Sequence, residues 1–282
     1  MSSRALLGRK RGEIIDTAFT TTWKTDNLFS GSSANNQIKL PLEGGGAVYN
    51  FIVDWGDGST NTITSATQAE TLHTYASIGV YTLKITGVFP KFYINNGAEK
   101  LKLIGIDSWG DVEFSSVQTL AYYGAINVAS LPEPSASINS MVGGFNTFRA
   151  MSLSSLPADM TLPLLENATQ MFFGNKLASL PADMTLPSLT GGSATFYNNK
   201  LIDLPTGMTL SSLGNGANMF FGNTINTTRY SQLLIDLENL NPNNSMSFHG
   251  GLSKYNSTGQ TARNILTTSP RLWTITDGGL VT

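Results

Sequence analysis

The sequence predicts a mainly β protein in three parts: an N-terminal β-sandwich, a solenoid of repeated coils, and a small α/β cap at the C-terminal end. Three observations lead to this fold class. A motif recurs every 24 residues, short segments of alternating apolar and polar residues precede it, and helical spacing of apolar residues follows it. We therefore divide the chain into an arm at 1–14, a sandwich at 15–90, a solenoid at 91–229 and a cap at 230–282.

The N-terminal arm is basic and lacks the apolar run that a secretory signal requires. Its charged and apolar residues are Arg4, Leu6, Leu7, Arg9, Lys10 and Arg11. Such a segment is either a solvated tail or a peptide that docks on a neighbouring subunit. A third alternative, an arm that binds nucleic acid, has little support because no aromatic residues are interleaved with the cations.

The sandwich is predicted from short strands separated by turn sequences. A turn rich in Gly and Asp at 56–59 ends one of these strands. The expected strands are 20–25, 37–40, 48–55, 60–64, 70–75 and 80–86. Strands of this length and spacing are typical of a small sandwich.

Two motifs in this part resemble a known family. Residues 54–59 read DWGDGS and residues 73–83 read HTYASIGVYTL, and both closely resemble the signatures of the polycystic-kidney-disease (PKD) domain. The resemblance implies an immunoglobulin-like β-sandwich in which Asp54, Asp57 and His73 serve the fold. A Ca²⁺ site at the two carboxylates is the alternative, but such sites usually gather six or more oxygen ligands.

The repeat is predicted from a compound motif. Residues 155–163 (SLPADMTLP) recur at 179–187 and, less faithfully, at 203–210, while residues 171–175 (MFFGN) recur at 219–223. The spacing fits leucine-rich-repeat chemistry, in which a short strand carries an apolar residue inward and an Asn amide then bonds the backbone of the turn. This predicts internal columns along the solenoid: Phe148, Phe172, Phe196 and Phe220; Leu153, Leu177 and Leu201; Leu156, Leu180 and Leu204.

The repeat and its flanks resemble a second family. The run at 109–111 (WGD), the FFGN turns and a preceding PKD-like unit look like the BspA-like leucine-rich-repeat proteins, which include bacterial surface proteins and phage tail or virion proteins. That family usually has Gly-Cys where this chain has Gly174-Asn175 and Gly222-Asn223. In the cap we expect a helix at 230–240, a strand at 245–249, a helix at 261–266 and a strand at 272–276, and this part resembles the unit that closes such repeat proteins.

Composition and motifs point away from catalysis. The chain has no cysteine and two histidines, and no catalytic or phosphate-binding motif is present. The formal charge of −2 gives no reason to expect nucleic-acid binding, and no apolar run is long enough to cross a bilayer. We therefore predict a protein that is not an enzyme, without cofactor, metal or membrane insertion.

Binding is the better-supported use of the repeat. Strand alternation would place Arg149, Phe173, Tyr197 and Phe221 on the side opposite the internal phenylalanines, as an outward aromatic ladder that binds a ligand. The alternatives are a second packing layer or a ladder that only stabilises its own coils.

The BspA-like resemblance and the missing signal sequence favour a phage virion protein, exposed on the particle as a tail or fibre component that attaches to the host surface. Residues 1–14 would then attach the chain to the virion. Expected partners are other virion structural proteins, a host surface glycan or protein, and a second copy of the chain. The alternatives are a capsid-surface decoration or structural virion subunit, a bacterial cell-surface adhesin, and a polysaccharide-active enzyme.

Overall fold

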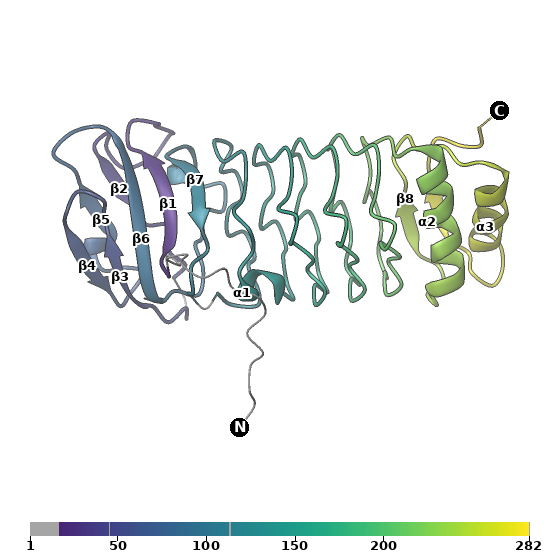
Figure 1. The fold of residues 1–282 in the computed structure, drawn as a ribbon, viewed down its shortest axis with the longest axis horizontal. Coiled ribbons are helices and arrows are strands. Elements are labelled where there is room, and N and C mark those ends of the chain that lie inside the picture. Colours follow the sequence, from purple (N-terminus) through teal and green to yellow (C-terminus); the bar gives the residue numbers. More distant parts are fainter. Residues whose placement is uncertain (1–16, 45, 113, 282) are drawn as a thin grey trace, which may run out of the picture.

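The computed structural model describes residues 17–44, 46–112 and 114–281. The molecule is elongated, with a β-sheet at one end, a row of stacked coils in the middle and two helices at the other end (Figure 1). The predicted virion-attachment residues Arg4, Leu6, Leu7, Arg9, Lys10 and Arg11 lie outside the described residues.

The sheet end is built on one antiparallel sheet of five strands in the order β4-β3-β6-β1-β7. Its strands are β1 (Phe19–Lys24), β3 (Asn50–Asp54), β4 (Thr60–Ile63), β6 (Val80–Val88) and β7 (Leu103–Ser108). A two-stranded pair, β2 (Gln37–Lys39) with β5 (Leu72–Thr74), accompanies it. Alternation directs the apolar side chains inward, as in β3, where Phe51 and Val53 are buried and Ile52 is exposed.

An aromatic core fills this end and continues into the coils. The ring of Phe19 lies 5.5 Å from that of Phe89 and 6.0 Å from that of Trp109, between centroids. Trp109 in turn lies 5.8 Å from Tyr122, which begins the internal column of the coils. The hydrophobic core is therefore continuous from the sheet into the repeat.

In the repeat, residues one period apart lie side by side. Single parallel bridges join Val117 to Gly143, Gly143 to Asn167, Asn167 to Gly191 and Gly191 to Asn215. The predicted internal phenylalanine column is present: the centroids of Phe148, Phe172, Phe196 and Phe220 are spaced by 5.7, 5.7 and 5.6 Å in turn, and all four are buried.

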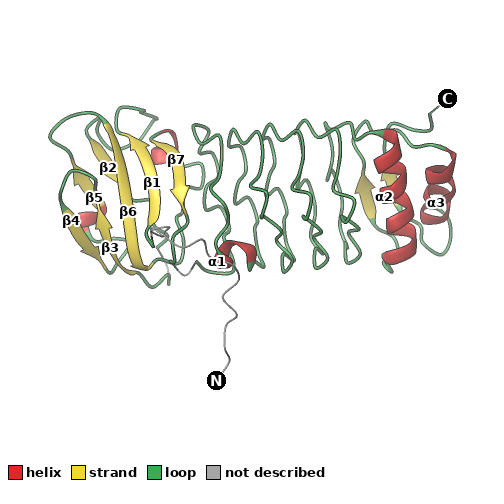
Figure 2. Ribbon diagram, in the orientation of Figure 1, coloured by secondary structure: helices red, strands yellow, loops and turns green. Residues whose placement is uncertain are grey.

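The fold class predicted from the sequence is nevertheless wrong. The described residues form a mostly β protein with a five-stranded antiparallel sheet and few helices, rather than an immunoglobulin-like sandwich followed by a leucine-rich-repeat solenoid. Only the short β2–β5 pair accompanies the main sheet. Between β7 and the next long helix, the described residues contain no β-strand, whereas a leucine-rich repeat needs one per coil (Figure 2).

Backbone conformation explains why the coils do not form strands. In one coil, Gln170 has φ 56° and Gly174 has φ 68°; in the next, Ala194 has φ 53° and Asn198 has φ 50°. Two left-handed residues four positions apart interrupt the extended conformation that a β-strand requires, although the coils still exchange backbone hydrogen bonds there, as from the N–H of Phe172 to the carbonyl of Thr195 at 3.0 Å. The 24-residue period of the sequence does not determine these backbone angles.

A chain of buried side-chain amides supplements the backbone hydrogen bonds that join neighbouring coils. The Oδ1 atom of Asn199 accepts a hydrogen bond from the backbone N–H of Leu177 at 3.1 Å. Its Nδ2 group donates to the carbonyls of Phe172 at 2.8 Å and Phe196 at 3.0 Å. Asn175 and Asn223 make the same three contacts one coil to either side.

The C-terminal end contains α2 (Thr227–Leu240), β8 (Ser247–His249), α3 (Ser257–Thr267) and β9 (Thr274–Thr276). The two strands pair in parallel. The Asn226 side chain caps α2 by accepting a hydrogen bond from the N–H of Arg229. Arg229 is buried and donates to carbonyls of the last coil, including that of Pro205 at 2.8 Å, so α2 is anchored to the stack. The short helices η1 (Ala69–Thr71), η2 (Ala98–Leu101) and α1 (Ala136–Asn139) complete the elements.

Candidate ligand-binding face

The residues predicted for ligand binding lie together in one stack. The rings of Phe173 and Tyr197 are parallel, with centroids 4.5 Å apart and an interplanar angle of 2°. Tyr197 and Phe221 follow at 4.6 Å and 8°. The guanidinium carbon of Arg149 lies over the Phe173 ring, 4.5 Å from its centroid. We call this row the ladder.

The ladder is partly open to solvent. Phe220 of the internal column is 0% exposed, whereas Phe221, the ladder residue that follows it, is 39% exposed. Each ladder residue directly follows an internal phenylalanine, so consecutive side chains point to opposite sides of the coil. The period of 24 residues then stacks equivalent side chains, which is why the sequence could locate the row.

Two members of the row were missed by the sequence. Tyr123 lies on the other side of Arg149, with the guanidinium carbon 5.0 Å from its ring centroid. His249 closes the opposite end, 5.3 Å from Phe221 between centroids and at 64°. Their spacings from the nearest ladder residues, 26 and 28 positions, depart from the period, so repeat counting alone does not find them.

The stacking determines which ring surfaces a ligand can reach. Each ring of the ladder covers the face of the next, so the faces are occupied and only the ring edges remain open. Aromatic faces carry negative potential and aromatic edges carry positive potential. The ladder therefore presents a row of electropositive edges rather than platforms on which a sugar or base could stack.

Hydrogen bonds fix both ends of the ladder. The guanidinium of Arg149 donates to the side-chain oxygens of Asn146, at 3.2 Å, and Gln170. The Nδ1 atom of His249 accepts from the backbone N–H of Gly251 at 3.0 Å. Burial lowers the pKa of His249 below its ordinary value, so the imidazole is neutral at neutral pH.

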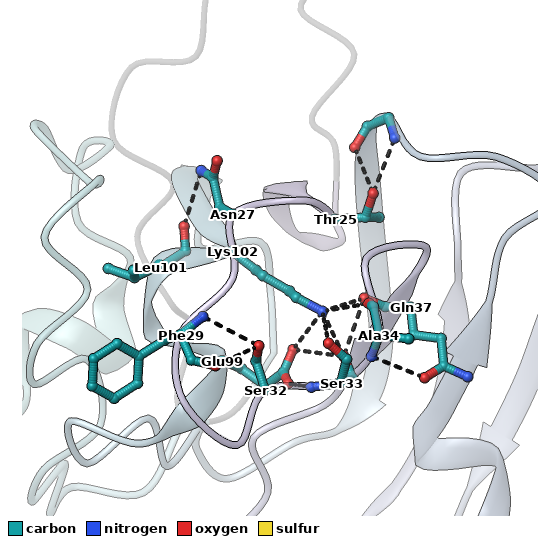
Figure 3. Close-up of polar contacts among 11 residues, drawn as sticks. Thr25, Asn27, Phe29, Ser32, Ser33, Ala34, Gln37, Glu99, Leu101 and Lys102 are labelled. Carbon is teal, nitrogen blue, oxygen red and sulfur yellow. Dashed lines mark hydrogen bonds and ion pairs between the residues drawn. The ribbon is translucent and has the colours of Figure 1, made fainter.

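A second polar cluster lies where the sheet end meets the first coil (Figure 3). The ammonium group of Lys102 is fully buried and donates to the carbonyls of Ser33, Ala34 and Gln37 at 2.8, 2.9 and 2.8 Å. Glu99 accepts a hydrogen bond from the backbone N–H of Ser33 at 2.6 Å and lies 3.6 Å from the ammonium. Burial lowers the pKa of Lys102, and the charge of Glu99 opposes this effect.

This cluster is a clamp rather than a catalytic site. Every oxygen around the ammonium belongs to the loop 33–37 or to η2, so Lys102 holds these segments together. A cavity of about 520 Å³ lies beside it, between β2 and η2, with Ser33 and Glu99 in its wall. The hydroxyl of Ser33 donates a hydrogen bond to the carboxylate of Glu99 at 3.1 Å, so these two side chains are bonded to each other.

Asp54 ends β3, Asp57 lies in the turn between β3 and β4, and His73 lies on β5. The Nε2 atom of His73 lies 2.7 Å from Oδ2 of Asp57, and its ring stacks on Trp55 at 4.6 Å. Asp54 accepts a hydrogen bond from the N–H of Gly56. Burial acts to raise the pKa of Asp57, but hydrogen bonds from Ser59 and His73 outweigh it and lower the pKa to about 2.

We expect Asp57→Asn to lower the free energy of unfolding by about 1 kcal/mol at pH 7, because solvent screening limits a partly exposed pair. The folded-state pKa of Asp57 lies below the ordinary value of 3.8, so its contribution is present above about pH 4 and is lost as the pH falls toward 2. Urea unfolding at pH 7 and pH 2.5 measures both. The exposed Asp183→Asn is the matched control, and an equal loss at both pH values would contradict the assignment.

Residues 17–44, 46–112 and 114–281 hold no group of three or more His, Cys, Asp or Glu side chains placed to bind a metal ion. In the same residues, no helix combines the length and the apolar character that spanning a bilayer requires.

Comparison of the chain with protein-family models, with curated proteins and with solved structures finds no match.

Proposed function

We propose that this chain is a non-catalytic binding protein, exposed on a phage virion as a tail or fibre component, and that the ladder contacts the host surface. The ladder is the observation that carries the proposal. Three aromatic rings and one guanidinium form a continuous, partly exposed row along the coils. Exposed aromatic rows on repeat proteins commonly serve recognition.

The virion setting draws its support from the sequence resemblance to BspA-like and phage fibre repeat proteins. An elongated body suits a component that reaches from a particle to a cell. Antibody labelling of intact particles, viewed by electron microscopy, tests this setting. Label at the tail or fibres is expected; label only on the capsid favours a decoration, and particles without label favour a bacterial adhesin.

A structural virion subunit is the second candidate, because the ladder rings cover one another's faces. In that case the ladder would stabilise the coils and contact no ligand. The binding experiment below separates the two candidates.

We expect Tyr197→Ala to weaken binding to a bacterial glycan array or to host cells by about tenfold or more, since it interrupts the row at its centre. The control is Ile202→Ala, which removes an apolar side chain that is 65% exposed and lies outside the ladder. Thermal unfolding of both variants verifies that they are folded. Unchanged binding by folded Tyr197→Ala would leave the structural role as the better description.

A further inference from the structure

The charges of the repeat are divided between two sides of the coils. Each coil consists of a front arc, which carries the ladder residue, and a back arc, which carries the Leu-Pro motif. The front arcs are 117–126, 143–152, 167–176, 191–200, 215–224 and 247–256, and the back arcs are 127–142, 153–166, 177–190 and 201–214.

The front arcs contain cations and no acidic residue: their charged residues are Arg149, Lys176, Lys200 and Lys254. The back arcs contain acids and no Lys or Arg: their charged residues are Glu133, Asp159, Glu166, Asp183 and Asp203. Glu166, the last residue of its arc, adjoins a front arc in the sequence. Asp277, outside both sets of arcs, acts on His249 of the last front arc but is paired with Arg263 at 2.8 Å. The ladder side is therefore positive on a chain whose net charge is −2.

The three front-arc lysines occupy equivalent places. Each follows a buried polar residue whose side-chain oxygen accepts a backbone N–H from the preceding coil: Asn175, Asn199 and Ser253. The three lysines are exposed. Within the described residues, none of their ammonium groups lies within ion-pair distance of a carboxylate; the Nζ of Lys176 lies 3.5 Å from the Ser152 hydroxyl.

This arrangement favours a partner with a line of negative charges. Stacked coils are about 5 Å apart, and like charges at equivalent positions of neighbouring strands or coils repel each other. Lys176 and Lys200 are such a pair. A bound anionic group relieves this repulsion, and the electropositive ring edges of the ladder favour the same kind of partner.

The geometry of the ladder also favours one class of polyanion over others. Single-stranded nucleic acid is normally held by bases stacked on aromatic faces, and the faces of this ladder are occupied by neighbouring rings. Sugar hydroxyls need amide and hydroxyl partners, and the front arcs carry exposed amides at Asn198 and Asn215. A linear polymer whose charges recur at regular intervals matches a row of cations better than a folded acidic protein does.

We infer that the front arcs bind an acidic polysaccharide that runs along the coil stack, with its anionic groups facing Lys176, Lys200 and Lys254. The inference rests on the proposed host-surface role and names the chemical class of the ligand. The ladder edges lie along the polymer, and Arg149 adds positive charge at one end.

The experiment titrates the full chain with polygalacturonate and with its fully methyl-esterified form, which has the same backbone without the charge. We expect measurable binding of polygalacturonate at 50 mM NaCl, about tenfold weaker binding of the ester, and loss of affinity at 200 mM NaCl. The double variant Lys176→Gln/Lys200→Gln is expected to bind polygalacturonate about tenfold more weakly. Lys39→Gln, an exposed charge on β2, is the control and should bind as the unaltered chain does.

Several results would overturn the inference: equal binding of the acid and its ester, no binding of either, no effect of the double variant, or tighter binding of oligodeoxythymidylate or polyglutamate. The outcomes also separate this inference from the proposed function. If Tyr197→Ala loses host-cell binding while acid and ester bind equally, the ladder role stands and the charge assignment fails. If polygalacturonate binds through the lysines but Tyr197→Ala changes neither the binding of the polymer nor the binding of host cells, the role of the ladder fails.

Discussion

Replacing Lys102 by methionine is expected to lower the free energy of unfolding by about 3–5 kcal/mol, the range for breaking a buried ion pair. Methionine keeps most of the aliphatic length but has no N–H donor. Three carbonyls of the loop 33–37 would lose their donor, and the carboxylate of Glu99 would lose the cation beside it. Urea unfolding measures the change through the transition midpoint at constant slope.

The matched control is Lys100→Met, on η2 and two positions before Lys102. Lys100 donates to Asn96 and lies over the Phe29 ring at 3.8 Å, but it is only partly buried, so the expected loss is about 1 kcal/mol or less. The double variant Glu99→Gln/Lys102→Met should be more stable than Lys102→Met, because it leaves no unpaired buried charge. A Lys102→Met protein as stable as the Lys100→Met control would show that the cluster is not a clamp.

This clamp was not predictable from the sequence. Ser33 and Lys102 are 69 positions apart, and Lys102 has the ordinary appearance of a surface lysine beside Glu99. Its burial follows from the pairing of β7 with β1, which brings η2 against the loop after β1. Tertiary packing determines the contact between η2 and the loop after β1, and local patterns in a single sequence do not predict it.

The repeat could be predicted to the extent that its contacts follow the period. The column of Phe172 and Phe196 and the row of Phe173 and Tyr197 both arise because residues 24 apart are stacked. Leucine-rich-repeat strands were predicted from the same period and were wrong, since residues such as Gln170 adopt left-handed conformations. Spacing determines which side chains meet, but it does not determine backbone angles.

At the C-terminal end, the expected elements are found with shifted limits. The helix expected at 230–240 begins earlier, at Thr227, because Asn226 rather than a later residue supplies the N-cap. The helix expected at 261–266 extends over Ser257–Thr267, because the side chain of Asn256 accepts hydrogen bonds from two backbone N–H groups of the first turn. Apolar spacing located both helices, and the capping contacts set where each begins.

The amide chain of the repeat leads to the second large effect, that of Asn199→Asp. The substitution changes one atom group: the Nδ2 donor becomes an oxygen facing the carbonyls of Phe172 and Phe196. Asn199 is only 5% exposed, so the new oxygen is buried against two acceptors. Losing two buried hydrogen bonds and placing a charge there should lower the free energy of unfolding at pH 7 by about 3–5 kcal/mol.

The sign of the pH dependence distinguishes this account from a simple loss of packing. Burial beside two carbonyls favours the protonated acid, so the folded-state pKa of the new carboxyl lies above its unfolded value. The folded protein then binds more protons than the unfolded chain between these two pKa values, and the variant gains stability as the pH is lowered through that range. The loss of stability relative to the unaltered chain should therefore be smaller at pH 4.5 than at pH 7.

Asn215→Asp is the control: it adds the same charge at an exposed site, where Oδ1 of the asparagine accepts a hydrogen bond from the N–H of Ala217. A defect of Asn199→Asp that is independent of pH, or equal to that of Asn215→Asp, would mean that the buried amide donors do not hold the coils together.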